Sequence, residues 1–242
     1  MKPKRIIFAR HGQSEGNVNK GVLEQKPDYA LELTLLGHEQ AEKRGQELNQ
    51  LIGEETVQWF ISPYFRTRQT FLGLRKAFKP PYRVYEDPRL REQDWGNLRH
   101  GIDYNKVEEA RDGYGHFYFR LPNGESCADV FDRIGGFIET IHRDFQKPKF
   151  ADNVIIVTHG MTMRVAIARW LHYTVEEFEK LANPENVGLL TLVLCAGGKY
   201  YLEGEPRRYA KLKHPYQFCW PPGGPGGNAG ESGQEHQVEQ KE

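Results

Sequence analysis

Short apolar runs that alternate with amphipathic helical patterns are the feature that most constrains the fold of this chain. The run Val154-Ile155-Ile156-Val157 contains no polar position, which is typical of a strand that is covered on both faces. Strands that are separated by helices favour crossover connections, and these place neighbouring strands parallel. We therefore predict an α/β fold, a three-layer sandwich in which a mostly parallel central sheet is flanked by helices.

Individual elements are predicted from the hydrophobic period and from local end signals. Thr34 can cap a helix that runs to about Ile52, and Ser62-Pro63 offers an N-cap and a first-position proline for a helix through about Phe78. Ser126 begins the clearest helix, and Ala196-Gly197-Gly198 predicts a hairpin. The expected strands are residues 5–10, 58–61, 82–85, 154–157, 189–195 and 199–202, and the expected helices are residues 34–52, 62–78, 126–145 and 161–171.

Two stretches lack a regular pattern. Residues 87–125 are rich in aromatic and charged side chains, and we expect them to form an excursion over the body of the domain. Residues 219–242 are rich in Pro and Gly and then polar, so they cannot bury enough apolar surface to become ordered. We expect one domain over residues 1–218, followed by a disordered tail.

Composition restricts the classes of partner. Lys+Arg and Asp+Glu both number 33, so the chain lacks the basic excess of a nucleic-acid or membrane-surface binder, and we expect neither partner. The three widely spaced cysteines argue against a disulfide framework and a cysteine zinc site, and Cys127 and Cys195 are interpreted as small core residues. Without an apolar run of membrane-spanning length or a signal-peptide pattern, a cytoplasmic protein is expected.

Cationic side chains follow three of the predicted strands. Arg10-His11 ends the first strand, Arg66 follows the strand at 58–61, and His159 follows the strand at 154–157. Because ligands bind at the carboxyl ends of parallel strands, we expect these side chains to meet at one edge of the sheet. Each is followed by a predicted helix start, whose free N–H groups favour an anion. Two guanidinium groups, two imidazoles and helix N-termini together are complementary to a phosphate group.

Each of these side chains also has a structural interpretation. Arg66 can be a solvated first-turn residue, although a cation at a helix N-terminus is unfavourable without an anion. His159 can be a hydrogen-bonded core histidine. Glu92 and Asp94, on a loop beside Trp95, form either a charged surface turn or a proton donor to a leaving oxygen, and local reasoning does not choose between the two carboxylates. Three strand ends with the same chemistry are nevertheless hard to obtain from packing alone.

Four motifs together resemble the histidine phosphatase superfamily, also called phosphoglycerate-mutase-like. They are Arg10-His11-Gly12-Gln13-Ser14-Glu15-Gly16-Asn17, Ser62-Pro63-Tyr64-Phe65-Arg66-Thr67-Arg68-Gln69-Thr70, Glu92 before Trp95-Gly96, and Thr158-His159-Gly160. The resemblance spans roughly residues 4–205 with the motifs in the family's order. The run from Phe117 to Ser126 is similar to the phosphatase branches, closest to the plant and fungal phosphoglycerate-mutase-like proteins.

The resemblance implies a role for each site residue. His11 would attack phosphorus through one ring nitrogen to form a phosphohistidine, with its other nitrogen held by a backbone carbonyl. Glu92 would protonate the departing alcohol and later take a proton from water, which leaves Asp94 a structural role. The residues implied to bind the phosphoryl group are Arg10, Asn17, Arg66, His159 and Gly160. The family chemistry implies no metal and no cofactor, and a small phosphorylated substrate.

Three activities remain open within this resemblance. We favour a metal-independent phosphomonoester phosphatase that acts on small phosphorylated metabolites, because Met161 follows His159-Gly160 where the glycolytic mutases commonly carry Asn. The alternatives are a cofactor-dependent phosphoglycerate mutase and a catalytically weak phosphate-binding regulatory module. A mutase needs further cationic groups, and residues 97–121 contain Arg99, His100, Lys106, Arg111 and His116. The aromatic side chains of the same region suggest a lid over the site.

Overall fold

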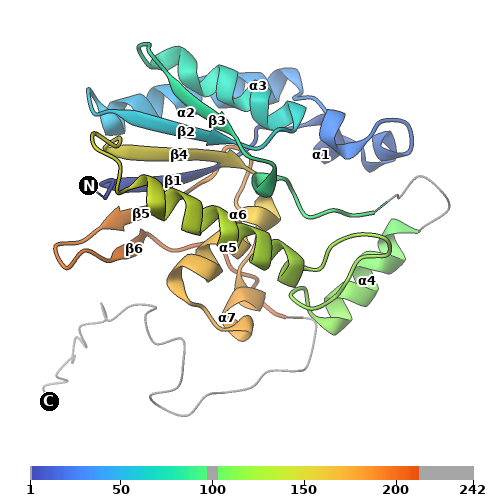
Figure 1. Ribbon diagram of the computed structural model, residues 1–242. Helices are drawn as coiled ribbons and strands as arrows, with labels where there is room; N and C mark the ends of the chain where they lie inside the picture. Colours follow the sequence, from blue (N-terminus) through green and yellow to red (C-terminus); the bar gives the residue numbers. More distant parts are fainter. Residues whose placement is uncertain (1, 97–102, 213–242) are drawn as a thin grey trace, which may run out of the picture.

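The computed structural model describes residues 2–96 and 103–212, and within them six strands form one sheet in the order β3-β2-β4-β1-β5-β6 (Figure 1). The strands are β1 (Arg5–Arg10), β2 (Val57–Ile61), β3 (Arg83–Glu86), β4 (Asn153–Thr158), β5 (Leu189–Leu194) and β6 (Tyr200–Glu203). The first four are parallel to their neighbours, whereas β5 is antiparallel to β1 and forms a hairpin with β6. The predicted α/β class with a mostly parallel sheet is confirmed.

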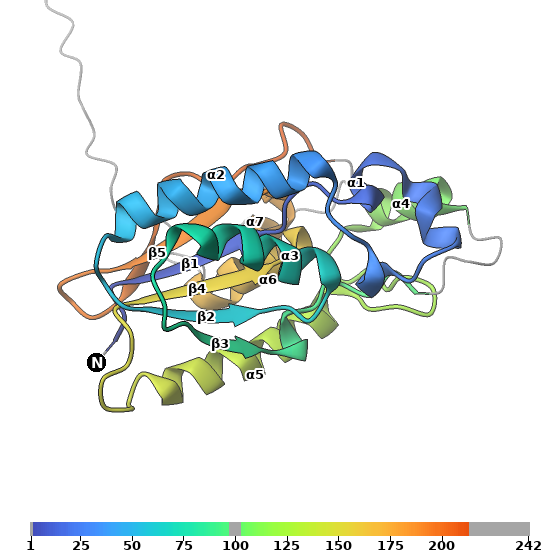
Figure 2. The same ribbon diagram turned by 90° about the horizontal axis from the view of Figure 1, so that it is seen from above.

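Helices cover both faces of the sheet, which explains why its central strands are apolar. Figure 2 shows α2 (Leu35–Ile52) and α3 (Phe65–Leu74) on one side and α5 (Cys127–Asp144) on the other, where α6 (Gly160–Leu171) and α7 (Val175–Lys180) also pack. Alternate residues of β1 enter different cores, since Ile7 packs with α2 and α3 while Ile6 packs with α5 and α6. All six residues of β4 are buried.

Shorter elements extend beyond the carboxyl ends of the strands. They are α1 (Glu15–Val18), the 3₁₀ turns η1 (Lys20–Glu24), η2 (Asp28–Ala30), η3 (Arg75–Ala77) and η4 (Pro88–Leu90), and helix α4 (Tyr104–Tyr114). Both ribbon views place α1 and α4 at the same end of the sheet (Figures 1 and 2). Segments that are far apart in the sequence therefore stand together around one strand edge.

Two predicted helix caps are confirmed and one is wrong. The Thr34 hydroxyl accepts a hydrogen bond from Gly37 N, and Ser126 forms a reciprocal capping box with Asp129 at the start of α5. Helix α3, however, begins at Phe65 after Tyr64, and it continues past Leu74 only as the 3₁₀ turn η3. Ser62 does not cap this helix, because its fully buried hydroxyl instead contacts a histidine described below.

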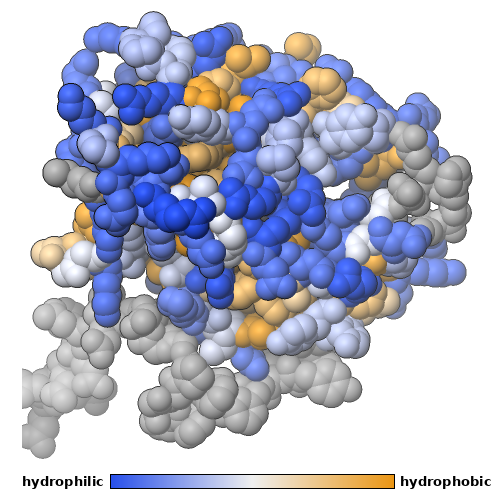
Figure 3. Space-filling view, in the orientation of Figure 1, coloured by the Kyte–Doolittle hydropathy of each residue, from blue (hydrophilic) through white to orange (hydrophobic). Residues whose placement is uncertain are grey.

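The surface and the cysteines complete the description. Figure 3 shows hydrophilic residues over much of one face, with apolar residues in separate groups. Cys127 is buried as predicted, but the prediction for Cys195 is wrong: β5 ends at Leu194, so Cys195 lies in the exposed hairpin turn.

Within the described ranges, no helix is long and apolar enough to cross a membrane. The predicted tail at 219–242, like Arg99 and His100, lies outside the described residues, and the boundary at 218 stays a prediction.

Candidate active site

A pocket of about 840 Å³ opens at the carboxyl ends of the parallel strands. Five of the predicted site residues line it: Arg10, His11, Asn17, Arg66 and Glu92. His159 and Gly160 are fully or largely buried and do not line this pocket. The His159 ring instead packs edge-on against the rings of His11 and Tyr64, with centroid separations of 5.3 and 5.0 Å. The structure thus brings the three strand ends together, with His159 one layer below the others.

His11 is held in one orientation by the backbone around it. Its amide donates to Thr158 O of the adjacent strand, and its Nδ1 lies 2.7 Å from the Gly12 carbonyl oxygen. A carbonyl only accepts, so Nδ1 carries the proton and Nε2 keeps its lone pair. Burial, followed by the charges of Arg66 and Arg10, lowers the pKa of His11 well below its usual value. The imidazole is therefore neutral and able to act as a nucleophile.

Gly12 allows the loop after His11 to lie directly against α2. A Cβ at this position would lie 2.5 Å from the carbonyl oxygen of Gly37 at the start of α2, a distance that no side chain tolerates. The Gly12 amide donates to Thr70 Oγ1 of α3. The loop that carries His11 is thus fixed between two helices.

The two arginines of the site differ in their partners. Arg10 Nη1 donates to Pro184 O at 2.6 Å, and its buried Nε has no partner among the described residues. Arg66, which is 4% exposed, contacts Asp28 through three pairs of atoms described below, and its guanidinium lies 4.9 Å from the Tyr64 ring centroid. Both guanidinium groups line the pocket, where they can bind the oxygens of an anion.

His159 connects the ends of two strands. Its Nε2 lies 2.8 Å from the hydroxyl of Ser62, which follows β2, and its buried Nδ1 has no partner among the described residues. Burial, followed by the positive charge of Arg66, lowers the pKa of His159 well below its usual value. His159 is therefore neutral in this structure, and its contact with the His11 ring fixes the position of that ring.

Glu92 binds the N-terminus of α6. Its Oε1 accepts hydrogen bonds from Gln93 N and Thr162 N, and its Oε2 accepts one from Met161 N. The Thr162 hydroxyl, which donates to Arg91 O at 2.7 Å, lies 3.1 Å from Oε1. The first turn of α6 thus binds an anionic group, as predicted, but for Met161 N and Thr162 N that group is the Glu92 carboxylate; binding of a phosphate by Gly160 stays a prediction. Oε2, with a single hydrogen bond, remains available to a substrate oxygen.

The structure distinguishes Glu92 from Asp94, which local sequence reasoning left open. Asp94 is exposed, and its Oδ1 accepts a hydrogen bond from Gly96 N within its own loop. Asp94 thus stabilises the turn that follows Glu92, and Glu92 is the carboxylate that is fixed against the site.

Asn17 presents its amide nitrogen to the pocket. Its Oδ1 accepts hydrogen bonds from Ser14 N, Ser14 Oγ and Asn186 Nδ2. With the oxygen fully used, Nδ2 is the group that can donate to a ligand. Asn186 also donates to His11 O, so the loop before β5 supports both residues.

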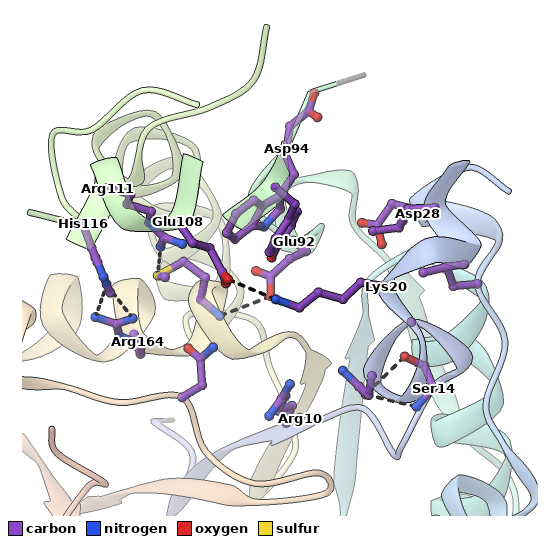
Figure 4. A pocket seen from close by; sticks show the side chains of 18 of the residues that line it. Arg10, Ser14, Lys20, Asp28, Glu92, Asp94, Glu108, Arg111, His116 and Arg164 are labelled. Carbon is purple, nitrogen blue, oxygen red and sulfur yellow. Dashed lines mark hydrogen bonds and ion pairs between the residues drawn. The ribbon is translucent and has the colours of Figure 1, made fainter. Parts of the chain in front are cut away.

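Two arginines and a histidine lie at the far side of the pocket, where Figure 4 shows Arg111, His116 and Arg164 together. Arg111 and Arg164 are 5% and 1% exposed, and the Nε of each has no partner among the described residues. Both terminal nitrogens of Arg164 approach His116 Nδ1 at 3.4 Å. Burial, followed by the charges of Arg111 and Arg164, lowers the pKa of His116 to about 4.

Acidic groups stand close to this far wall as well. Asp112 Oδ1 lies 2.9 Å from His116 Nε2, and the Glu179 carboxylate accepts hydrogen bonds from the amides of His116 and Phe117. Among residues 2–96 and 103–212, no three or more His, Cys, Asp or Glu side chains are grouped so that they could hold a metal ion.

Sequence reasoning missed several residues of the site. Arg164 lies between apolar residues in the middle of α6, whereas Arg169 stands in its last turn, and this mid-helix charge was the available signal for a buried arginine. Ser62 was assigned to a helix cap. Asp28 and the loop at 183–186 carry no local signal, because polar residues in a turn are ordinary.

Comparison with known proteins shows the family of this chain. The family model of the histidine phosphatase superfamily (branch 1) matches residues 6–204. A phosphoglycerate mutase-like protein of Arabidopsis thaliana is 39% identical over 217 residues, covering 83% of this chain and 77% of that protein. A broad-range acid phosphatase of Saccharomyces cerevisiae is 28% identical, covering 80% and 86% of the two chains. The chain therefore belongs to the histidine phosphatase superfamily.

Solved structures show the same fold. A mycobacterial glucosyl-3-phosphoglycerate phosphatase, determined with VO₃, superposes with a TM-score of 0.65 at 24% identity, covering 84% of this chain and 99% of that one. A protein described as mycobacterial hydrolase 1 gives a TM-score of 0.67 at 21% identity, covering 86% and 100%.

Proposed function

We propose that this protein is a metal-independent phosphomonoester phosphatase that acts on small phosphorylated metabolites through a phosphohistidine at His11. The observation that carries the proposal is the neutral, buried His11, whose Nδ1–H is directed to the Gly12 carbonyl oxygen while two arginines line the same pocket. The phosphatase names of several relatives, including the yeast broad-range acid phosphatase, support hydrolysis as the reaction.

The reaction proceeds in two half-reactions. His11 Nε2 attacks phosphorus, the bond between phosphorus and the ester oxygen breaks, and the departing alcohol takes a proton from the Glu92 carboxyl group. Water then attacks phosphorus and gives its proton to Glu92, the bond to Nε2 breaks, and inorganic phosphate leaves. His11 is then again unphosphorylated, and Glu92 is again protonated.

Positive charge at the site stabilises the transferring group. Arg10 and Arg66 bind the phosphoryl oxygens, and Asn17 Nδ2 adds a neutral donor. His159 lies beneath His11, so its contribution in the resting state is to hold the nucleophile in place.

Hydrolysis of p-nitrophenyl phosphate at mildly acidic pH, with EDTA present, tests the proposal. We expect turnover in EDTA, its loss in His11→Ala, and an acid-labile, alkali-stable phosphoryl group trapped on the wild-type protein. His38→Ala, on the outer helix α2 and away from the pocket, serves as the control and should retain activity. Failure to hydrolyse any phosphomonoester would contradict the proposal.

Arg111 and Arg164 favour a second candidate, the phosphoglycerate mutase. A mutase must bind a second anionic group of its substrate, and two buried guanidinium groups with unpartnered Nε atoms suit that task. Incubation of 3-phosphoglycerate with 2,3-bisphosphoglycerate separates the two activities. Efficient formation of 2-phosphoglycerate would favour the mutase, whereas release of inorganic phosphate favours the phosphatase.

A further inference from the structure

Asp28 occupies one edge of the Arg66 guanidinium. Arg66 Nη1 lies 3.0 Å from Asp28 Oδ1, and Nη2 donates to Asp28 Oδ2 at 3.2 Å. Nη1 also donates to the Asp28 main-chain oxygen at 2.6 Å. Two parallel contacts between a guanidinium and the two oxygens of an anion are the arrangement in which arginine also binds phosphate. The Asp28 carboxylate therefore takes the place that two phosphate oxygens can take.

Contacts of the neighbouring backbone and side chains hold Asp28 in this position. Asp28 begins η2, and three residues later the buried Leu31 anchors the segment. The Leu33 amide then donates to Gln69 Oε1 of α3, the helix that carries Arg66. The carboxylate itself is 38% exposed and lines the pocket, so a ligand can reach it.

Arg10 provides the contrast within the same site. Among the described residues Arg10 makes no ion pair, and its Nη1 donates to the main-chain oxygen of Pro184. Arg66 alone of the two thus has its charge offset by a carboxylate before a substrate arrives. That charge matters at the site, because Arg66 is the charged group that most lowers the pKa of His11 and His159.

We propose that Asp28 competes with the phosphate group for Arg66, and thereby weakens phosphate binding and promotes the release of inorganic phosphate. This inference rests on the proposed function, since it requires phosphate to bind at Arg66. When phosphate is bound, Arg66 exchanges its side-chain contacts with Asp28 for contacts with the phosphoryl oxygens. When phosphate leaves, the Asp28 carboxylate returns to the guanidinium, so release does not leave a buried charge unpaired.

The alternative role for Asp28, a support that orients Arg66, predicts the opposite result. If Asp28 only positions Arg66, removing its charge loosens the guanidinium and weakens phosphate binding. If Asp28 competes, the same change strengthens phosphate binding. The sign of the change therefore separates the two roles.

The test measures the competitive inhibition constant of inorganic phosphate against p-nitrophenyl phosphate, together with direct binding of phosphate by calorimetry. In Asp28→Asn we expect the inhibition constant to fall about two- to fivefold, the range for a partly exposed ion pair. The KM should fall in parallel, and kcat should fall if phosphate release limits turnover. Asp28→Ser, which also removes the charge and retains the main-chain contact, is a second variant with the same expected direction.

Glu32→Gln is the matched control. Glu32 lies in the same segment, carries the same charge and pairs with Lys26 rather than with Arg66, and it does not line the pocket. We expect its phosphate inhibition constant to equal that of the wild type. Both Asp28 variants must bind phosphate and have the melting temperature of the wild type. If their phosphate inhibition constant is then unchanged or raised, the inference about Asp28 is overturned and the proposed function is not. A wild-type protein that binds no phosphate would overturn the proposed function with it.

Discussion

The floor and the wall of the pocket are built in different ways. We define the floor as Arg10, His11 and Arg66, which follow strand ends, together with His159, which packs against His11. We define the wall as the lining residues from the segments beyond the strand ends: Lys20, Leu23, Pro27, Asp28, Tyr29, Leu31, Trp95, Tyr104, Glu108, Arg111, Asp112 and His116. Parallel pairing places Arg10 opposite Thr158, the residue before His159, so the sheet itself fixes the floor. The wall consists of 3₁₀ turns and the helix α4, joined by side-chain contacts across the mouth.

This difference separates chemistry from recognition. The floor is largely buried and is held by the sheet, which suits the positioning that phosphoryl transfer requires. The wall is half-exposed in most places and mixes aromatic, acidic and basic side chains, which suits selection among leaving groups. Substitutions in the floor should therefore change turnover for every substrate, and substitutions in the wall should change the ranking of substrates.

The largest effect is expected for Glu92→Gln, which tests whether Glu92 donates the proton to the leaving oxygen. Turnover of an alkyl phosphate such as glycerol phosphate should fall about 10²- to 10⁴-fold, because its leaving oxygen needs a proton. Turnover of p-nitrophenyl phosphate should fall much less, because its leaving group is already acidic. Asp94→Asn in the same loop is the control, and an equal loss on both substrates would contradict the role of Glu92.

A pH experiment tests whether His116, in the wall, is shielded from solvent as the floor residues are. The pKa of His116 is lowered to about 4, so the unfolded chain binds its proton first as pH falls below about 6.5, and stability is lost in that direction. His116→Gln should reduce the loss of unfolding free energy between pH 7 and pH 5 by about 1–2 kcal/mol. Urea denaturation at both pH values measures this difference, and an unchanged difference would show that His116 is solvated.

Arg111→Gln tests recognition at the wall directly. The ratio of kcat/KM for 3-phosphoglycerate to that for p-nitrophenyl phosphate should fall about tenfold, because Arg111 can contact a second anionic group. Lys106→Gln, exposed on the same helix, should leave the ratio unchanged. An equal loss on both substrates would show that Arg111 affects turnover in general and does not recognise a second anionic group.

The smallest effect is expected for Lys20→Ala, which breaks one contact across the mouth. Lys20 Nζ pairs with Glu108 at 3.1 Å and lies 3.9 Å from the Tyr104 ring centroid, and Figure 4 shows it reaching toward Glu108. Loss of these exposed contacts should raise KM about two- to threefold without changing kcat. The exposed Lys43→Ala is the control, and a change in kcat alone would contradict a role in binding.

The same division explains what could be predicted from the sequence. Arg10, His11, Arg66 and His159 follow apolar strands, and the rule that ligands bind at carboxyl strand ends brings them together. The fold class follows from the fully apolar run at 154–157. Asp28 and the loop at 183–186 were missed because their contacts join distant segments through ordinary turn residues.

Ser62 was misassigned for a related physical reason. Ser followed by Pro is a strong helix-start signal, but a hydroxyl that is fully buried beside a histidine takes the nearest partner, here His159 Nε2. Tertiary contact thus overrode the local preference. Arg164, a charge among apolar residues in the middle of α6, shows that a charge in an unexpected place is also a usable signal.

The carboxylate of Glu92 has a consequence for how this protein acquires activity. Two of the hydrogen bonds that hold the proposed proton donor come from Met161 N and Thr162 N, in the first turn of α6, a helix buried along most of its length. A chain in which α6 is not yet docked therefore has no assembled acid, and it cannot complete turnover on an alkyl ester. The proposed acid and the docking of α6 therefore depend on the same side chain.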